Sequence, residues 1–195
     1  NQNDTSGTAS FKTPSTDKVV ALTHWGRSGT GLLHSLIDGH PEVSTLPSMY
    51  LSEYFHHSTW ENIISNGWDQ IVDCFMAKYD VLFDADSTVP VQSKGRALNY
   101  RIGRAEGMTS VGDQRDEILR VDRESFRAEL QSSMKSYDQL DAFLFFKLVH
   151  NAYEKVIGNS NQKSIIFYHI HNPSVHAQLN FIQLAEKANW IMMVR

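Results

Sequence analysis

Three short apolar runs alternate with longer amphipathic segments along the chain. The runs lie at residues 18–24, 164–170 and 190–194, and each has the length and composition of a buried β-strand. The segments between them carry apolar residues at helical spacing. Strands that alternate with helices predict an α/β fold, in which a parallel sheet lies between helices in three layers.

The segment from about 52 to 160 predicts a long, mainly helical insertion between the first two of these strands. Its apolar residues mark helices at 68–79, 126–137 and 140–156, and Gly158 ends the last of them. Ser58 is predicted to start an earlier helix, because Ser58-Thr59-Trp60-Glu61 fits a capping box. Residues 92–116, rich in Gly, Lys and Arg, predict a surface loop or a loosely folded lid. We expect the insertion to lie over the carboxyl edge of the sheet.

The charge and the apolar content of the chain exclude several classes of protein. Eighteen basic and 22 acidic residues give a net charge of −4, which argues against general binding to nucleic acid or to a membrane surface. The chain has no apolar run long enough to span a bilayer. Residues 1–17 are polar and predict a disordered lead-in, so residues 18–195 form a single predicted domain.

The single cysteine bears on the compartment. Cys74 cannot form an internal disulfide, and its apolar neighbours predict a buried, inert thiol. This favours a cytoplasmic location. The glycosylation sequon Asn3-Asp4-Thr5 keeps the Golgi lumen as an alternative, which would require a membrane anchor ahead of residue 1.

The first apolar run leads into a glycine-bearing loop that opens a helix. Gly26 and Gly29 allow a sharp reversal, and Leu32, Leu33, Leu36 and Ile37 follow at helical spacing. The unpaired backbone N–H groups of residues 28–32 and the positive end of the helix dipole converge there. The loop is therefore predicted to bind a phosphate or another anion.

Two common phosphate-binding loops do not fit this segment. A Walker loop needs a Gly-Lys-Ser/Thr ending, but Gly31 is followed by Leu32 and no lysine is present. The dinucleotide pattern Gly-x-Gly-x-x-Gly fails because the glycines have the wrong spacing. The strong cation in this loop is Arg27, which stands before the turn.

The loop resembles the 5′-phosphosulfate loop of sulfotransferases that use 3′-phosphoadenosine 5′-phosphosulfate (PAPS). In the tyrosylprotein, carbohydrate and bacterial branches of that family, a strand leads into Arg-Ser-Gly-Thr/Ser-Thr-Leu, and a His-Pro pair closes the helix. This chain has Arg27-Ser28-Gly29-Thr30-Gly31-Leu32 and then Gly39-His40-Pro41. It departs from the family at Gly31, where a threonine is usual. The resemblance implies a P-loop-like sheet, with residues 27–32 holding the 5′-phosphate.

A second resemblance lies at the far end of the chain. The residue pattern predicts Asn172-Pro173 as the N-cap and first helical residue, and Val175 to Ala188 as an amphipathic helix. His171-Asn172-Pro173 stands where sulfotransferases have a Lys-x-Pro segment that starts such a helix. Arg195 stands where the family has the arginine that binds the nucleotide 3′-phosphate. In the family, a serine and an adenine-covering loop follow that arginine. We therefore expect these 195 residues to be part of a longer protein and a poor enzyme alone.

The resemblance implies transfer of a sulfuryl group from PAPS to a hydroxyl, or less often an amine, by in-line displacement and without a metal. The resemblance also implies that the acceptor is a carbohydrate, a tyrosine or a small molecule. Arg27 would stabilise the charge that develops on the departing nucleotide. If the loop only joins strand to helix, Arg27 instead forms a surface ion pair.

The base that removes the acceptor proton stays open. Relatives place a glutamate shortly after the His-Pro pair, but Ser48 stands near that place, and Glu53 follows five residues later with His56 and His57 beside it. His169 and His171 share one face of the second predicted strand and are the other candidates. Two other functions remain: a P-loop kinase acting on a small molecule, and a degenerate module that binds a nucleotide or a partner without catalysis.

Overall fold

The computed structural model describes residues 18–24, 28–46, 51, 53–93, 96–100, 108–158, 163–170 and 174–194. Three of the predicted site residues, Arg27, His171 and Arg195, lie outside these ranges, as does the predicted lead-in at 1–17.

The centre of the fold is a four-stranded parallel sheet with the order β2-β5-β1-β6. Its strands are β1 (Lys18–His24), β2 (Val43–Ser44), β5 (Ile165–Ile170) and β6 (Asn189–Met193). The α/β prediction and the three predicted strands are confirmed. Strand β2 was not predicted, because two residues are too short to show a pattern of apolar positions. In the dinucleotide-binding fold, the first and second strands of the sheet are neighbours. Here β5 lies between β1 and β2, so the described sheet has a different strand order.

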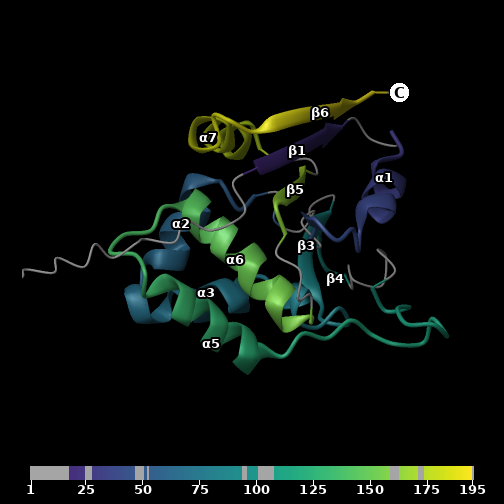
Figure 1. Ribbon diagram of the computed structural model, residues 1–195, viewed down its shortest axis with the longest axis horizontal. Coiled ribbons are helices and arrows are strands. Elements are labelled where there is room, and N and C mark those ends of the chain that lie inside the picture. Colours follow the sequence, from purple (N-terminus) through teal and green to yellow (C-terminus); the bar gives the residue numbers. More distant parts are fainter. Residues whose placement is uncertain are drawn as a thin grey trace, which may run out of the picture.

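Helices cover both faces of the sheet, in agreement with the three-layer prediction. Helix α1 (Thr30–Ile37) connects β1 to β2, and α7 (Val175–Leu184) connects β5 to β6. These connections run in opposite directions across the sheet, so right-handed crossovers put the two helices on opposite faces. Helix α6 (Ala142–Val156) leads into β5 from the α7 side. Figure 1 shows α1 and α6 on opposite sides of β5.

The contacts of two β5 side chains show which helices cover each face of the sheet. The Phe167 ring lies 5.9 Å from the ring of His34 on α1. The Tyr168 ring lies 5.1 Å from Phe146 on α6 and 5.1 Å from Phe181 on α7. Alternate residues of β5 therefore face different layers, as the strand period requires.

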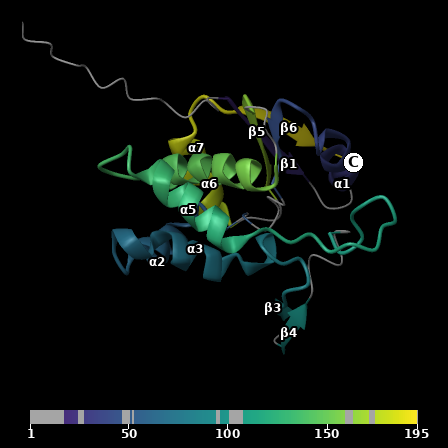
Figure 2. The same cartoon turned by 60° about the horizontal axis from the view of Figure 1, so that its bottom comes forward.

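The insertion is mainly helical, as predicted, but it also contains a hairpin. Its described helices are α2 (His57–Ile64), α3 (Ile71–Lys78), α5 (Arg123–Met134) and α6, with short 3-10 helices η2 (Trp68–Gln70) and η3 (Asp80–Leu82). Strands β3 (Val89–Ser93) and β4 (Arg96–Tyr100) pair antiparallel where a loop was predicted. Figure 2 shows this hairpin extending away from the parallel sheet. Through Tyr168 of β5, the insertion helix α6 packs against the face of the sheet that α7 covers. The insertion therefore covers a face of the sheet and does not lie only over its carboxyl edge, where it was expected.

Two predicted helix starts are wrong by two residues. Helix α2 begins at His57, because the ring of His56 caps it by accepting a hydrogen bond from the Ser58 N–H at 3.3 Å. Helix α7 has Ser174 rather than Asn172 as its N-cap, and it ends at Leu184. In both cases a neighbouring side chain supplies the capping acceptor. No helix in the described part of the chain is long and apolar enough to cross a membrane.

The core is an aromatic cluster between the α7 side of the sheet and the helical insertion. The predicted apolar face of α3 is confirmed, since Ile71, Val72, Phe75 and Met76 are all buried. Trp68, predicted to share it, is 41% exposed. Cys74 is half-buried rather than enclosed, and the Asn66 side-chain amide lies 3.4 Å from its sulfur. The largest fully buried rings belong to the following residues: Tyr54, Tyr168, Phe75, Phe83, Phe126, Phe145, Phe146 and Phe181.

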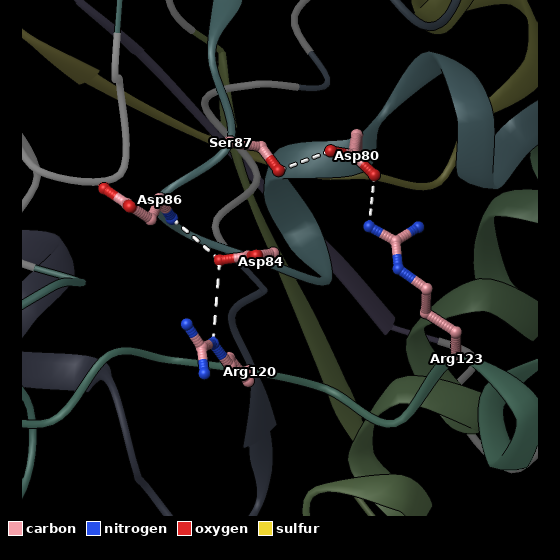
Figure 3. A network of polar contacts seen from close by, with 6 residues as sticks. All are labelled: Asp80, Asp84, Asp86, Ser87, Arg120 and Arg123. Carbon is pink, nitrogen blue, oxygen red and sulfur yellow. Dashed lines mark hydrogen bonds and ion pairs between the residues drawn. The ribbon is translucent and has the colours of Figure 1, made fainter.

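Hydrogen bonds join the chain segment that leads into the β3–β4 hairpin to the segment that returns after it. We call residues 80–87 and 119–123 the neck. Across it, the Ala85 N–H donates to the Leu119 carbonyl at 3.1 Å, and the Val121 N–H donates to the Phe83 carbonyl at 3.0 Å. Asp80 accepts from Ser87 and from Arg123, as Figure 3 shows. Beyond the neck, Met108, Val111 and Leu119 line the same cavity as residues of α1.

Candidate functional site

The predicted phosphate loop lies at the carboxyl end of the central strand β1. Gly29 is the N-cap of α1 and has φ 83°, a left-handed conformation that favours glycine. No side chain caps this helix end. The first intrahelical bond runs from the Leu33 N–H to the Gly29 carbonyl at 3.2 Å. The amides of residues 30–32 therefore belong to the first turn, whose N–H groups have no partner within the helix.

Ser28 and Thr30 flank the left-handed glycine. The Ser28 hydroxyl oxygen is buried and has no hydrogen-bond partner among the described residues. Thr30 is buried, at 6% exposure. By contrast, Leu32 and Leu36 are 67% and 74% exposed, so only half of the predicted apolar stripe of α1 turns toward the sheet. Leu32 can thus contribute a backbone N–H to an anion site, but its side chain points to solvent.

The ends of three strands meet at this loop. In the register of the sheet, Thr23 lies opposite Ile170 of β5, and His24 lies opposite Met193 of β6. A Cβ added to Gly29 would lie 3.9 Å from the terminal carbon of Met193. The carboxyl end of β6 is therefore beside the loop, although Arg195 itself lies outside the described residues.

Glu53 reaches the start of α7. Its carboxylate accepts one hydrogen bond from the Ser174 backbone N–H at 2.5 Å and another from the Ser174 hydroxyl at 2.9 Å. Ser174 in turn accepts from the Ala177 N–H at 3.2 Å as the N-cap. Since α7 follows β5, this contact brings Glu53 close to the carboxyl edge of the sheet.

Of the two histidines that follow Glu53, His56 also lies beside the first turn of α7, whereas His57 does not. The ring of His56 lies 6.1 Å from the ring of His176 on α7. His57 is exposed and lies 3.0 Å from Glu61 on the surface of α2. The structure therefore brings Glu53, but not His57, to the start of α7.

His169 lies on the other face of β5, under α1. It is 2% exposed, and its ring lies 5.6 Å from the ring of His34. Glu53 lies on the α7 side instead, because the Leu51 carbonyl just before it accepts from the hydroxyl of Tyr168 at 2.8 Å. The structure does not bring Glu53 and His169 into one group.

A cavity of about 380 Å³ adjoins His169 beneath α1. Its polar lining includes His34, Asp38, Glu154 and Lys163. Burial lowers the pKa of His34, while the nearby Asp38 carboxylate acts in the opposite direction. Lys163 is 5% exposed; its ammonium donates to the His40 carbonyl at 2.6 Å and lies 3.9 Å from Glu154.

Sequence reasoning missed this group because its members come from α1, from the end of α6 and from the turn before β5. The one local signal is the spacing of His34 and Asp38, which puts them one turn apart on the same face of α1. Within the described ranges, no three His, Cys, Asp or Glu side chains are placed to hold a metal ion.

Comparison with family models, with curated proteins and with solved structures gives no match for this chain.

Proposed function

We propose that this chain is a sulfotransferase domain that transfers a sulfuryl group from PAPS to a hydroxyl or amine acceptor. One observation carries the proposal. Residues 28–30 follow the central strand β1 and turn into α1 through the left-handed Gly29, and the end of β6 lies beside them. A ligand of an open α/β sheet binds at this edge.

The described loop residues fit a 5′-phosphate. The first-turn amides of α1 and the positive end of its dipole favour a dianion. The buried Ser28 hydroxyl, which lacks a partner among the described residues, can donate one more hydrogen bond. By resemblance, Arg27 binds the same phosphate and Arg195 binds the 3′-phosphate.

PAPS supplies a sulfuryl group with the nucleotide phosphate as its leaving group. In the transfer, the acceptor oxygen forms a bond to sulfur while the bond from sulfur to the phosphate oxygen breaks. The acceptor proton passes to a base on the protein, and the negative charge passes to the released nucleotide. Arg27 and the loop amides stabilise that charge as it develops.

Glu53 is the proposed base. Glu53 is exposed and contacts the start of α7. Helix α7 follows β5, which is a neighbour of β1 in the sheet. Strands β5 and β1 are parallel neighbours about 4.8 Å apart, so the chain that follows β5 and the loop that follows β1 leave the same edge of the sheet. His169 is the less favoured base, because it is buried under α1. His171 stays a candidate by resemblance alone.

Calorimetric titration with adenosine 3′,5′-bisphosphate tests the proposal. We expect binding, and we expect Arg27→Ala to weaken it at least tenfold, because a hydrogen bond to a charged group is worth about 1.5–3 kcal/mol. Arg120→Ala is the matched control, since it removes the same charge from the neck. Magnesium ATP is titrated in parallel.

Three results would contradict the proposal. Preference for magnesium ATP would favour a small-molecule kinase. Binding of neither nucleotide would remove the nucleotide site. Bisphosphate binding without sulfuryl transfer to any acceptor would favour a degenerate binding module. The half-buried single thiol, with no disulfide partner in the chain, supports a cytoplasmic location as part of the same proposal.

A further inference from the structure

The cavity beneath α1 has the features of a small-molecule site. Its volume of about 380 Å³ falls in the range of roughly 300–1,000 Å³ that is usual for such pockets. Its walls come from α1, from the β2 edge of the sheet, from the end of α6 and from residues 108–119. Most of these walls are apolar, and Val43, Leu46, Val111 and Leu119 contribute to them. The cavity therefore offers a hydrophobic ligand a large area to bury.

One nitrogen of the lining residue His34 lacks a partner among the described residues. The Nδ1 atom of His34 is buried and makes no hydrogen bond within the described residues. A buried polar atom without a partner costs about 1–3 kcal/mol, so a ligand that supplies the missing bond recovers that energy. A hydroxyl group suits this nitrogen in either tautomer, since it can both donate and accept.

The charged groups in the cavity disfavour an anionic ligand. Asp38 and Glu154 bring two carboxylates, and Lys163 brings one ammonium. Asp38 accepts a hydrogen bond from Thr45 at 2.6 Å, and Lys163 already contacts the His40 carbonyl and Glu154. An acidic ligand would therefore meet an excess of negative charge and a lysine that is already engaged.

We propose that this cavity binds a hydrophobic, uncharged hydroxyl compound, with its hydroxyl group hydrogen-bonded to His34. The inference goes beyond the proposed function, because the ligand binds without a nucleotide. Gly31 belongs both to the cavity lining and to the predicted phosphate loop, so the two sites adjoin at this residue.

Three naphthalene compounds test the proposal by fluorescence titration of the whole chain in the absence of nucleotide. We expect 2-naphthol to bind about five- to tenfold more tightly than naphthalene, which is the value of one hydrogen bond. We expect 2-naphthoate to bind more weakly than either, because of its charge. Equal affinity for naphthol and naphthalene, or preference for naphthoate, would overturn the proposal without any variant.

Variants locate the site. His34→Phe keeps an aromatic ring but removes both nitrogens, so it should abolish the preference for naphthol while naphthalene still binds. Val111→Trp fills the cavity from the side of the 108–119 segment and should weaken both ligands at least tenfold. His57→Phe is the matched control, because its imidazole is exposed on α2.

The outcomes separate this proposal from the nucleotide site. If the naphthol preference persists in His34→Phe, or if Val111→Trp binds both ligands normally, the proposed cavity is not the site and the inference fails. If His34→Phe does not fold, Val111→Trp and the three-compound comparison still decide it. Arg27 is not among the residues that line the cavity, so we expect Arg27→Ala to weaken bisphosphate binding and to leave the naphthol preference unchanged. Failure of one proposal therefore does not imply failure of the other.

Discussion

At the scale of single residues, the two glycines of the loop predict opposite effects on stability. Gly29 has φ 83°, and a Cβ there would make only an ordinary contact with Met193, so Gly29→Ala costs the left-handed conformation alone, about 1–2 kcal/mol. Gly31 lies inside α1, where an added Cβ meets no described atom within 4 Å. Gly31→Ala should therefore stabilise the protein by about 0.4–1 kcal/mol.

Urea unfolding of the two alanine variants checks this pair, each being the control for the other. If both variants lose stability equally, the described turn at the start of α1 is wrong.

His150 predicts a loss of stability in acid. It is completely buried, its Nδ1 lies 2.7 Å from the Ser44 hydroxyl, and burial lowers its pKa to about 3. The unfolded chain takes up this proton near pH 6.5, while the folded protein resists it. Stability is therefore unaffected above pH 6.5 and falls by up to about 1.4 kcal/mol per pH unit between pH 6.5 and pH 3.

The variant His150→Asn isolates that contribution. An asparagine amide can still bond to Ser44 but does not titrate, so its free energy of unfolding should fall less steeply from pH 6.5 to pH 4.5. Carboxylates such as Asp80, whose pKa is lowered by hydrogen bonds from Ser87 and Arg123 in spite of its partial burial, affect both proteins equally. Parallel pH curves for the two proteins would refute the assignment to His150.

At the scale of elements, the start of α7 depends on a residue 121 positions earlier. Glu53 accepts both the backbone and the hydroxyl protons of Ser174. Because the two side chains share a contact, Glu53→Ala and Ser174→Ala should be non-additive by at least about 0.5 kcal/mol in a double-mutant cycle. Each single change should cost roughly 1 kcal/mol, as for the loss of a helix cap.

The N-cap of α6 gives the control cycle. Asp141 accepts from the Leu144 N–H at 2.7 Å, and no described hydrogen bond joins it to Glu53. Glu53→Ala and Asp141→Ala should therefore add. Coupling in the control pair, or its absence in the Glu53 pair, would show that Glu53 does not hold α7.

The elements that the sequence predicted well are those with a strong local pattern of apolar residues. Strands β1, β5 and β6 are apolar runs, and the spacing of Phe126, Leu130 and Met134 correctly predicts the buried face of α5. Strand β2 and the β3–β4 hairpin were missed, because pairing partners rather than local periodicity define them. The start of α7 was misplaced because its cap is completed by Glu53, which no local pattern connects to Ser174.

The candidate site divides in the same way. The turn at Gly29 was predictable, since a strand, glycines and a helix follow one another within a few residues. The cavity was not, because His34, Lys163 and His169 come together only through the parallel pairing of β2 with β5 and the crossover of α1. Long-range placement of this kind leaves no mark at any fixed spacing.

At the scale of the whole molecule, exposed apolar side chains gather along the β6 edge of the sheet and on α7. In the described sheet β6 is an edge strand, and Trp190, Ile191, Met192 and Val194 at that edge are 40% to 67% exposed. On α7, Val175 and Leu179 are 68% and 52% exposed. An apolar edge strand with unpaired backbone groups promotes association between chains.

This distribution predicts that the 195-residue chain self-associates as its concentration rises, and that Met192→Lys reduces the association. The Met192 side chain is 67% exposed, so a lysine there adds charge to the edge at little cost to folding. Asn62→Lys adds the same charge on α2, far along the chain from β6, and should leave association unchanged. Sedimentation velocity over a concentration series measures the effect. If Met192→Lys and Asn62→Lys associate alike, net charge rather than the β6 edge governs association, and the edge strand has no part in it.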